Sequence, residues 1–371
     1  MRILMLCPQI SGSSFLVSHS YGKIAAKKHD VFFVGPTFGK KPFIEDDSID
    51  VRYVEPVIKN PVQIGMINLF ATNLVKLLKD FRGEYDVIHA FKLLPHTAPV
   101  AAAVKKITGT PFILTIDDYD SKSPSNPIKK FVLSLSEGAY KSADEITVST
   151  KYLQRIYGGN LVYQVSDEKL FDPKKHTGKK IRKKYNLEDK IVITHVGTLH
   201  DFKGIDILIE AVRSLKRDDI KLILFESGEN IEKYKRMSGD ETIWVPPVNF
   251  FDVPEYVAAA DIYVIPTKDT IYSRAETPRK IFDAMAMGRA IIATNLADVP
   301  KFLDDGKCGI IVKPGSMEEL KKAISKLADD RNLRNRLGER ARKHYLKTLS
   351  YKILEKQLLG IYSKIENKIR R

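Results

Sequence analysis

Short apolar runs alternate with longer amphipathic stretches in the first half of the chain. The apolar runs predict buried strands at Arg2–Cys7, Asp30–Pro36, Val51–Glu55, Asp86–Ala90, Pro111–Ile116 and Glu145–Thr150. The stretches between them have helical patterns, which predict helices at Phe15–Lys28, Val62–Phe81, Thr97–Thr108, Ile128–Lys141 and Lys151–Tyr157. Strands that alternate with helices in this way predict a parallel, doubly wound α/β sheet.

A polar and strongly basic segment, Asp167–Asp189, interrupts the alternation and predicts a domain boundary. The pattern then restarts with strands at Ile191–Gly197, Lys221–Ser227, Ile243–Val245, Asp261–Pro266 and Ala290–Thr294, and with helices at Ile205–Leu215, Val253–Ala259, Met317–Asp329, Arg331–Tyr345 and Ile353–Ile369. We therefore predict two Rossmann-like domains, residues 1–170 and 171–349, followed by a last helix. Ligands of such sheets bind beyond the carboxyl ends of the strands, so two facing domains would bind ligands in the cleft between them.

One segment, Arg274–Lys301, combines a helix start, a helix stop and a buried strand. Thr277 is a candidate N-cap, and Pro278 would occupy the first helical position, where its missing N–H costs nothing. Gly288 is placed to adopt the left-handed conformation that ends a helix.

The same segment carries a polar stripe. Glu276, Lys280 and Asp283 are spaced to lie on one face of the predicted helix. A positive helix N-terminus with a carboxylate further along could hold a phosphate and a sugar hydroxyl. The alternative is a solvated salt-bridge stripe on an ordinary helix.

Composition sets broad limits on the class of protein. The chain has 371 residues, enough for two domains, and its two cysteines, Cys7 and Cys308, exclude a disulfide scaffold and favour a reducing compartment. The opening residues predict a first strand and not a signal peptide, and no apolar run has the length of a membrane span. We expect a cytoplasmic protein.

The net charge of +15 is concentrated late in the sequence. Arg331–Arg371 carries 13 Lys and Arg residues against 3 Asp and Glu residues. Such a segment is typical of a protein with an anionic partner, namely nucleic acid, a membrane surface or a phosphorylated substrate, or it is a solvated helix face. No nucleic-acid-binding motif accompanies these residues, so we expect no nucleic-acid partner.

Two loops are candidates for phosphate binding. Gly12 and Ser13 lie in a Gly/Ser loop that joins the first strand to a helix, where backbone N–H groups can approach a phosphate. The loop lacks the GxGxxG pattern of dinucleotide sites, and a structural turn is the alternative. Lys203 and Gly204 directly precede a helix in the second domain, where a lysine could bind a diphosphate or lie exposed on a loop.

Three carboxylates follow the predicted strand Pro111–Ile116. Asp117, Asp118 and Asp120 lie at the carboxyl edge of a sheet, where they could orient a sugar hydroxyl, act as a base or bind a metal. The alternative is an acidic loop that caps a helix. The motifs of serine hydrolases, zinc proteases and zinc ribbons do not occur in the sequence.

Several motifs, taken in order, resemble those of the retaining glycosyltransferases of family 4 (glycosyltransferase group 1), which have the GT-B fold. VGTLHDFKGIDILIEA resembles the phosphate segment of the family, and ADIYVIPTKD, DAMAMGRAIIAT and DVPKFLDDGKCGIIVKPGS resemble three later motifs of its donor domain. ADEITVST and VSDEKLFDP match the end of the family's first domain. The segment ETPRKIFDAMAMG resembles a sub-branch with P-x-K-x-F-D in place of E-x7-E.

The resemblance implies roles for the candidate residues. The second domain would bind a nucleotide-diphosphate-sugar such as a UDP- or GDP-sugar, with Lys203 on the diphosphate and Asp283 on the ribose. Gly12, Ser13 and Gly204 would lie near the donor phosphates, and Glu276, Thr277, Pro278 and Lys280 would supply further donor contacts. The resemblance implies no obligatory metal or other cofactor. It also implies that the last helix, about 350–371, completes the first domain.

This sequence departs from the family pattern at three positions. Thr198 replaces an arginine, Ala275 stands at the first glutamate of E-x7-E, and Asp117 stands where the family often has a histidine. With these departures, Asp117, Asp118 and Lys203 are our candidate catalytic residues.

We therefore predict a two-domain GT-B glycosyltransferase that moves a sugar from a nucleotide-sugar to a hydroxyl acceptor, such as a lipid-linked glycan or a polysaccharide. The helix Val62–Phe81 and the basic surface could place the enzyme on an anionic membrane. Two alternatives remain open. One is a nucleotide-sugar 2-epimerase on the same fold, and the other is a catalytically impaired nucleotide-sugar-binding module.

Overall fold

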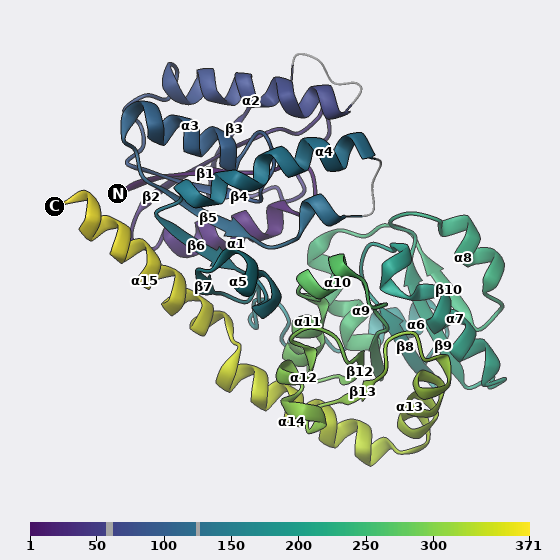
Figure 1. Cartoon of the computed structure of the whole chain (residues 1–371). Helices are drawn as coiled ribbons and strands as arrows, with labels where there is room; N and C mark the ends of the chain where they lie inside the picture. Colours follow the sequence, from purple (N-terminus) through teal and green to yellow (C-terminus); the bar gives the residue numbers. More distant parts are fainter. Residues whose placement is uncertain (57–61, 124–126) are drawn as a thin grey trace. The chain divides into compact units, whose positions relative to one another are not determined.

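The computed structural model describes residues 1–56, 62–123 and 127–371 and divides into two α/β units (Figure 1). Unit 1 comprises Met1–Gln164 and Leu354–Arg371, and unit 2 comprises Val165–Ile353. Each unit has its own parallel sheet, which confirms the predicted fold class.

Unit 1 is built on a seven-stranded parallel sheet with the strand order β3-β2-β1-β4-β5-β6-β7. Its strands are β1 (Arg2–Leu6), β2 (Asp30–Gly35), β3 (Asp50–Tyr53), β4 (Val87–Phe91), β5 (Phe112–Ile116), β6 (Glu145–Val148) and β7 (Asn160–Leu161). Every residue of the central strands β4 and β5 is buried, whereas the edge strand β3 is largely exposed. Near-continuous apolar runs are expected in a parallel sheet that helices cover on both faces.

The helices of unit 1 lie on both faces of this sheet. They are α1 (Phe15–Ala25), α2 (Val62–Leu78), α3 (Ala98–Thr108), the 3₁₀ turns η1 (Asp120–Lys122) and η2 (Glu137–Ser142), α4 (Pro127–Ser136), α5 (Lys151–Tyr157) and the greater part of α15 (Tyr351–Ile369). Figure 1 shows α2, α3 and α4 on one face and α1 with α15 on the other. The predicted helix Ile128–Lys141 is thus two elements, because the chain tightens into a 3₁₀ turn around Gly138.

The last helix is anchored in unit 1 by a buried polar chain. The Tyr362 hydroxyl lies 2.8 Å from Nδ1 of His89, and Nε2 of His89 lies 2.7 Å from the Thr115 hydroxyl. Burial lowers the pKa of His89 to about 3, so this ring is neutral and serves the packing of α15 against β4 and β5.

Unit 2 is built on a six-stranded parallel sheet with the strand order β10-β9-β8-β11-β12-β13. Its strands are β8 (Ile191–His195), β9 (Ile220–Phe225), β10 (Thr242–Val245), β11 (Ile262–Ile265), β12 (Ala290–Thr294) and β13 (Ile310–Val312). Its helices and 3₁₀ turns are α6 (Lys179–Lys184), η3 (Asp201–Lys203), α7 (Ile205–Ser214), α8 (Ile231–Met237), η4 (Phe250–Asp252), α9 (Val253–Ala259), α10 (Ile271–Ala275), α11 (Lys280–Ala286), α12 (Val299–Phe302), η5 (Asp304–Gly306), α13 (Met317–Asp329) and α14 (Arg331–Thr348).

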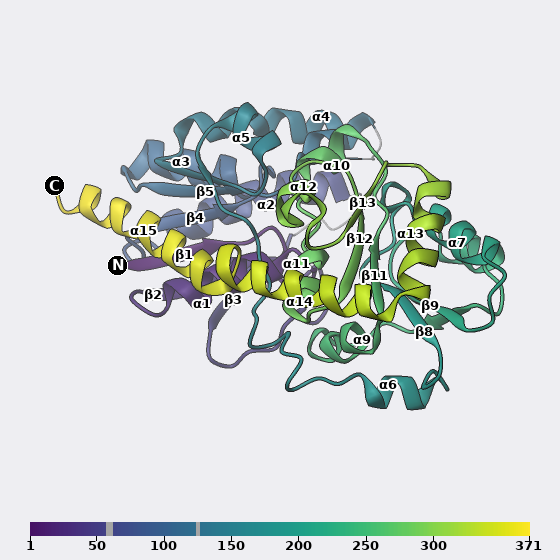
Figure 2. The same ribbon diagram turned by 90° about the horizontal axis from the view of Figure 1, so that it is seen from below.

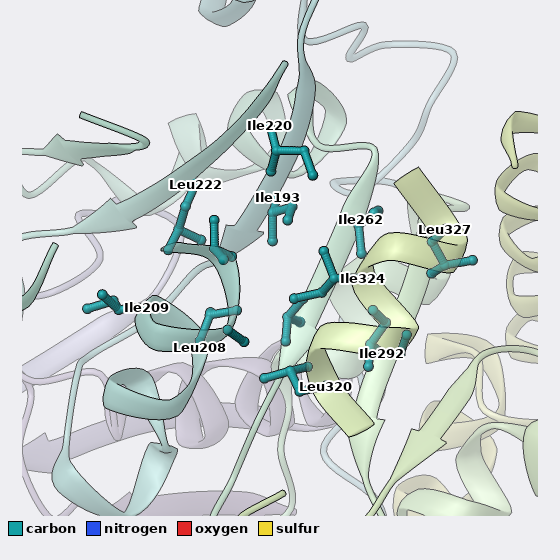
Figure 3. Close-up of a cluster of buried hydrophobic side chains, with 14 of the residues drawn as sticks. Ile193, Leu208, Ile209, Ile220, Leu222, Ile262, Ile292, Leu320, Ile324 and Leu327 are labelled. Atoms are coloured by element: carbon teal, nitrogen blue, oxygen red, sulfur yellow. The ribbon is translucent and has the colours of Figure 1, made fainter. Parts of the chain in front are cut away.

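Helices cover both faces of the second sheet as well. Helices α7 and α13 pack together on one face, and α9, α11 and α14 pack on the other (Figure 2). Figure 3 shows the core under α7 and α13, where Leu208 and Ile324 meet strand residues such as Ile193 and Ile262. We find no helix, among the described residues, that is long and apolar enough to span a bilayer.

Helix α11 ends as predicted but begins later than predicted. Gly288 has a φ of 67°, its N–H donates to the Met285 carbonyl at 3.0 Å, and the Arg289 N–H donates to the Ala284 carbonyl at 2.9 Å, which is a Schellman cap. At the other end the helix starts at Lys280, with Arg279 and not Thr277 as its N-cap.

The late start has a local cause. The Arg279 N–H bonds to the Thr277 carbonyl at 2.7 Å, and the Ile281 N–H bonds to the Pro278 carbonyl at 2.8 Å, so the first turn is too tight for an α-helix. Glu276 is the C-cap of α10, and the predicted stripe of Glu276, Lys280 and Asp283 on one helix is therefore wrong.

Helix α14 crosses the end of α11 at very close range. A Cβ atom placed on Gly338 of α14 would lie 2.2 Å from the carbonyl oxygen of Gly288. We predict that Gly338→Ala lowers the free energy of unfolding by about 1 to 3 kcal/mol, because backbone must move to admit the methyl group. The measurement is chemical denaturation.

Gly360 on α15 is the matched control, since nothing lies within 4 Å of a Cβ placed there. Gly360→Ala should leave stability unchanged or raise it slightly, because alanine favours an exposed helix. Equal destabilisation by both substitutions would contradict the packing described here.

Candidate functional site

A pocket in unit 2 lies where strands β11 and β12 end. It is lined by Ile265, Thr267, Ser273, Glu276, Pro278, Thr294, Leu296, Ala297 and Val299. The Thr294 hydroxyl donates to the Thr267 carbonyl at 2.9 Å, whereas the Thr267 hydroxyl is buried and has no hydrogen-bond partner. A buried hydroxyl without a partner is rare, so Thr267 is available to a polar ligand group in this pocket.

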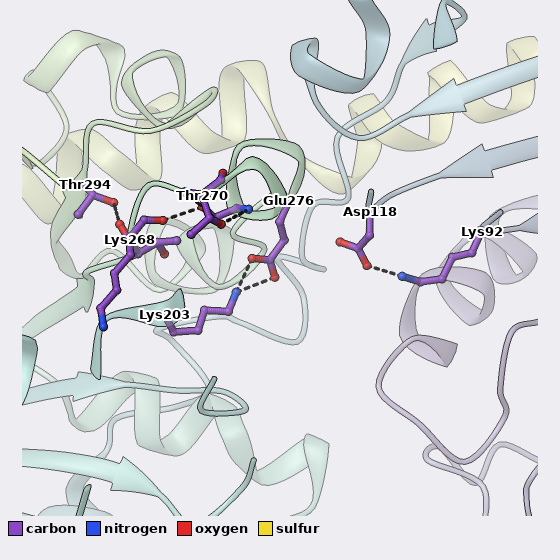
Figure 4. Close-up of polar contacts among 9 residues, drawn as sticks. Lys92, Asp118, Lys203, Lys268, Thr270, Glu276 and Thr294 are labelled. Atoms are coloured by element: carbon purple, nitrogen blue, oxygen red, sulfur yellow. Dashed lines mark hydrogen bonds and ion pairs between the residues drawn. The ribbon is translucent and has the colours of Figure 1, made fainter. Parts of the chain in front are cut away.

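Glu276 connects this pocket to the predicted phosphate-binding lysine. Nζ of Lys203 lies 2.6 Å from both carboxylate oxygens of Glu276 (Figure 4). The lysine comes from η3, after β8, and the glutamate from the end of α10. The structure therefore brings together two predicted site residues that are far apart in the sequence.

Gly204 fixes the position of Lys203. Its φ is 70°, and a Cβ atom there would lie 2.1 Å from the carbonyl oxygen of Pro266. Both the conformation and the close approach require glycine. The glycine of the predicted Lys203-Gly204 pair thus holds the loop against the end of β11.

A second lysine and carboxylate lie on α11. Nζ of Lys280 is 3.7 Å from Oδ2 of Asp283, and the Ser166 hydroxyl donates to Oδ1 of the same carboxylate. The Asp283 side chain is only 3% exposed. Both of its oxygens therefore face protein groups, and a ribose hydroxyl would have to displace one of them.

Lys280 is the more exposed member of this pair and lies against the glycine that follows β8. A Cβ on Gly197 would be 3.5 Å from Cε of Lys280. Burial, the largest cause, lowers the pKa of Lys280, and the charges of Arg279 and Lys203 lower it further, while Asp283 raises it. The neighbouring ammonium groups of Lys203 and Lys280 would therefore both attract an approaching anion.

The remaining predicted donor residues are dispersed. Thr198 is exposed in the loop after β8, Thr277 is buried, and Pro278 lines the pocket beside Glu276. In unit 1, Gly12 and Ser13 lie in the loop before α1, which the Ser11 hydroxyl ties to the Thr37 carbonyl at 2.6 Å.

The three predicted aspartates of unit 1 surround a lysine that was not among the predicted site residues. Lys92 follows β4 and donates to Asp118, as Figure 4 shows, and its Nζ lies 3.4 Å from Asp117 and 3.5 Å from Asp120. Strands β4 and β5 are neighbours in the sheet, so residues that follow them meet at one edge. That adjacency was the signal that could have pointed to Lys92.

One lysine is too few to neutralise three carboxylates. Burial, the largest cause, raises the pKa of Asp117 and raises the pKa of Asp120 to about 7, with neighbouring aspartates adding to both shifts and Lys92 opposing them. Oδ2 of Asp120 is buried and has no hydrogen-bond partner, whereas Oδ1 of Asp117, which also lacks a hydrogen bond, lies 3.4 Å from Nζ of Lys92. The cluster is thus placed to accept hydrogen bonds from a ligand.

One group of potential metal ligands occurs in the part of the chain that the structure describes. Ligand atoms of Asp304, Cys308 and His344 in unit 2 lie within 4.8 Å of one another. None of them is a predicted site residue or lines the pocket.

Two family models match the chain. The model described as "Glycosyl transferases group 1" matches residues 178–344, and the model described as "Glycosyltransferase Family 4" matches residues 12–164. An uncharacterised glycosyltransferase of Methanocaldococcus jannaschii is 28% identical over 244 residues. That match covers 64% of this chain and 59% of the relative.

Solved structures share the whole fold at low identity. Sucrose-phosphate synthase from Thermosynechococcus elongatus has a TM-score of 0.79 at 18% identity and covers 99% of this chain and 100% of its own. HepE from Anabaena, solved in complex with UDP-glucose, has a TM-score of 0.75 at 18% identity, with coverage of 98% and 100%. The likeness supports the GT-B fold of this chain.

The raised pKa of Asp120 gives a prediction for stability. The folded chain keeps a proton on Asp120 up to about pH 7, whereas the unfolded chain loses it near the ordinary value of 3.8, so stability falls as the pH rises between these values. Asp120→Asn should remove this part of the pH dependence and raise stability at about pH 8 by on the order of 1 kcal/mol or more. Thermal denaturation between pH 5 and 8 measures both effects.

Asp47→Asn is the control, because Asp47 is an exposed aspartate of the same unit. The same pH dependence in Asp120→Asn as in the unchanged chain would show that Asp120 is ionised throughout this range.

Proposed function

The chain belongs to the group 1 glycosyltransferases of family 4, and we propose that it transfers a sugar from a nucleotide-diphosphate-sugar to a hydroxyl acceptor with retention of configuration. The observation that carries the proposal is the Lys203–Glu276 pair beside the pocket at the ends of β11 and β12. It lies in the unit that matches the group 1 model.

The charges of unit 2 suit an anionic donor. Lys203 and Lys280 come from two different elements, and each is balanced by one carboxylate. A diphosphate near Lys203 would compete with Glu276 for the ammonium group and release a carboxylate that accepts hydrogen bonds from sugar hydroxyls. UDP-glucose is the ligand named for HepE, which supports a UDP-sugar as the first donor to test.

The same two lysines suit the chemical step. Transfer breaks the bond between the anomeric carbon and the diphosphate oxygen, and negative charge develops on that oxygen. Ammonium groups that are already in place stabilise this charge, which is the main contribution expected of a site for phosphate leaving groups. The acceptor oxygen forms the new bond on the same face, and its proton passes to the leaving diphosphate.

The charges of unit 1 suit a hydroxyl acceptor. Three carboxyl groups share Lys92, and Oδ2 of Asp120 is buried without a hydrogen-bond partner. Carboxyl oxygens accept hydrogen bonds from hydroxyl groups, so Asp117 and Asp118 are proposed to position the acceptor. We also propose that the enzyme is cytoplasmic and makes peripheral contact with an anionic membrane, where lipid-linked acceptors occur.

We predict that Lys203→Ala weakens binding of a nucleoside diphosphate by about tenfold to a hundredfold, because a charge-assisted hydrogen bond to the phosphate is lost. Calorimetric titration with UDP, GDP and ADP measures the effect and identifies the nucleotide. Lys307→Ala is the control, since that side chain is 71% exposed and should not contribute.

Equal affinity of Lys203→Ala and the unchanged chain would refute the diphosphate role of Lys203. Incubation with UDP- and GDP-sugars without acceptor separates the alternatives: an epimerised sugar would identify an epimerase, and donor binding without transfer across an acceptor panel would identify a binding module.

Asp283→Asn tests the ribose contact separately. Because Asp283 is buried against Ser166 and Lys280, the substitution should lower the melting temperature in any case. If Asp283 also binds the ribose, affinity for the nucleoside diphosphate should fall by about tenfold, whereas affinity for inorganic pyrophosphate should change little. Equal losses for both ligands would assign Asp283 to the support of Lys280 alone.

A further inference from the structure

Asp304, Cys308 and His344 form a group of three potential metal ligands in unit 2. A carboxylate oxygen of Asp304, Sγ of Cys308 and a ring nitrogen of His344 all lie within 4.8 Å of one another. Asp304 and Cys308 belong to the connection between α12 and β13, whereas His344 lies on α14. The group therefore brings together two segments of unit 2 that are separate in the sequence.

Backbone hydrogen bonds hold the connection in the conformation that brings its two ligands together. The Lys307 N–H donates to the Asp304 carbonyl at 3.1 Å, and the Cys308 N–H donates to the Leu303 carbonyl at 3.0 Å. The chain thus folds back on itself between Asp304 and Cys308, and their side chains meet.

The position of His344 is fixed by its neighbour on α14. Tyr345 is fully buried, and its ring centroid lies 6.2 Å from that of Phe282 on α11. Among the described residues, neither the Cys308 thiol nor the His344 ring has a hydrogen-bond partner. Both are therefore available as ligands.

The chemistry of the three ligands indicates which metal they would bind. Thiolate and imidazole ligands suit Zn²⁺, whereas Mg²⁺ and Ca²⁺ take oxygen ligands. A tetrahedral Zn²⁺ with bonds of about 2.0 to 2.3 Å separates its ligand atoms by roughly 3.3 to 3.8 Å. The three atoms must draw together by at most about 1.5 Å, which rotation of the Asp304 side chain, 42% exposed, can supply.

The charges around the group are compatible with a divalent cation. The Asp304 carboxylate and the Cys308 thiolate would together balance the charge of Zn²⁺. Oδ2 of Asp304 lies 3.3 Å from Nζ of Lys307, but such an exposed ion pair contributes little and a metal ion can replace it. Arg340, whose charge also acts on Cys308, is exposed on α14, where solvent screens it.

We propose that Asp304, Cys308 and His344 form a Zn²⁺ site that joins the α12–β13 connection to α14, with the fourth coordination position open to water. The site goes beyond the proposed function, which assigns no metal, and none of the three residues lines the pocket. Its role is structural: an ion that binds the folded chain and not the unfolded chain stabilises unit 2.

The test is titration of the full chain, without an affinity tag, with ZnCl₂ in competition with a chromophoric chelator. The unchanged chain should bind one Zn²⁺ with a dissociation constant of about 1 μM or lower, and Zn²⁺ should raise its melting temperature. With CoCl₂ instead, a thiolate-to-cobalt charge-transfer band should appear. Cys308→Ser should remove this band, whereas Cys7→Ser, which changes the other cysteine of the chain, should keep it.

Asp304→Asn and Asp305→Asn are a matched pair of variants. The two residues have φ angles of 48° and 51°, and Asn adopts this left-handed conformation as Asp does, so each substitution removes a carboxylate without straining the turn. Asp304→Asn should lower the affinity for Zn²⁺ by about tenfold or more. Asp305→Asn should leave it unchanged, because Asp305 is exposed and is not one of the three ligands.

Thermal melting in EDTA shows whether each variant folds, and the pair of Asn variants decides if Cys308→Ser does not. No stoichiometric binding of Zn²⁺ by the unchanged chain would overturn the proposal. Equal affinities of Asp304→Asn and Asp305→Asn, or a cobalt band that survives Cys308→Ser, would overturn it as well. Titration with UDP in EDTA reports on the proposed function, so the two proposals can fail independently.

Discussion

The contact between Gly204 and the Pro266 carbonyl controls the geometry of unit 2. With a Cβ position only 2.1 Å from that oxygen, no other residue allows the η3 loop to lie on the end of β11. The Lys268 N–H completes the contact with a 2.8 Å hydrogen bond to the Phe202 carbonyl. Lys203 lies between these two contacts along the chain, so its backbone is fixed from both sides, and a fixed backbone is what orients a long side chain toward Glu276.

Rigid strand ends explain why the site forms where it does. β8, β11 and β12 are neighbours in one parallel sheet, so the segments that follow them meet at the same edge. Lys203 and Glu276 reach that edge from the segments that follow β8 and β11, and Thr294 is the last residue of β12. These side chains come to one edge only because the sheet aligns the ends of its strands. Residues at this edge can be substituted without disturbing the hydrophobic core of the unit.

The sequence predicted well those features that depend on local pattern. The glycine that ends α11 and the strands of both sheets follow from backbone conformation and short-range periodicity, except the edge strands β7 and β13, which are only two and three residues long and were not predicted. The site was predicted less completely because its contacts join residues that are distant in the sequence. Ser166 reaches Asp283 across 117 positions, and Lys92 gains meaning only once β4 and β5 are known to be neighbours. Glu276 was assigned to the wrong helix because the tight turn through Arg279 depends on tertiary packing, which propensity does not describe.

The same limit applies to faces of helices, as α4 shows. Periodicity shows that Ile128–Ser136 has apolar positions on both sides, but it does not say which side the protein covers. Only the packed structure shows that Val132 and Leu133 are taken up by unit 1 and that Phe131 is not.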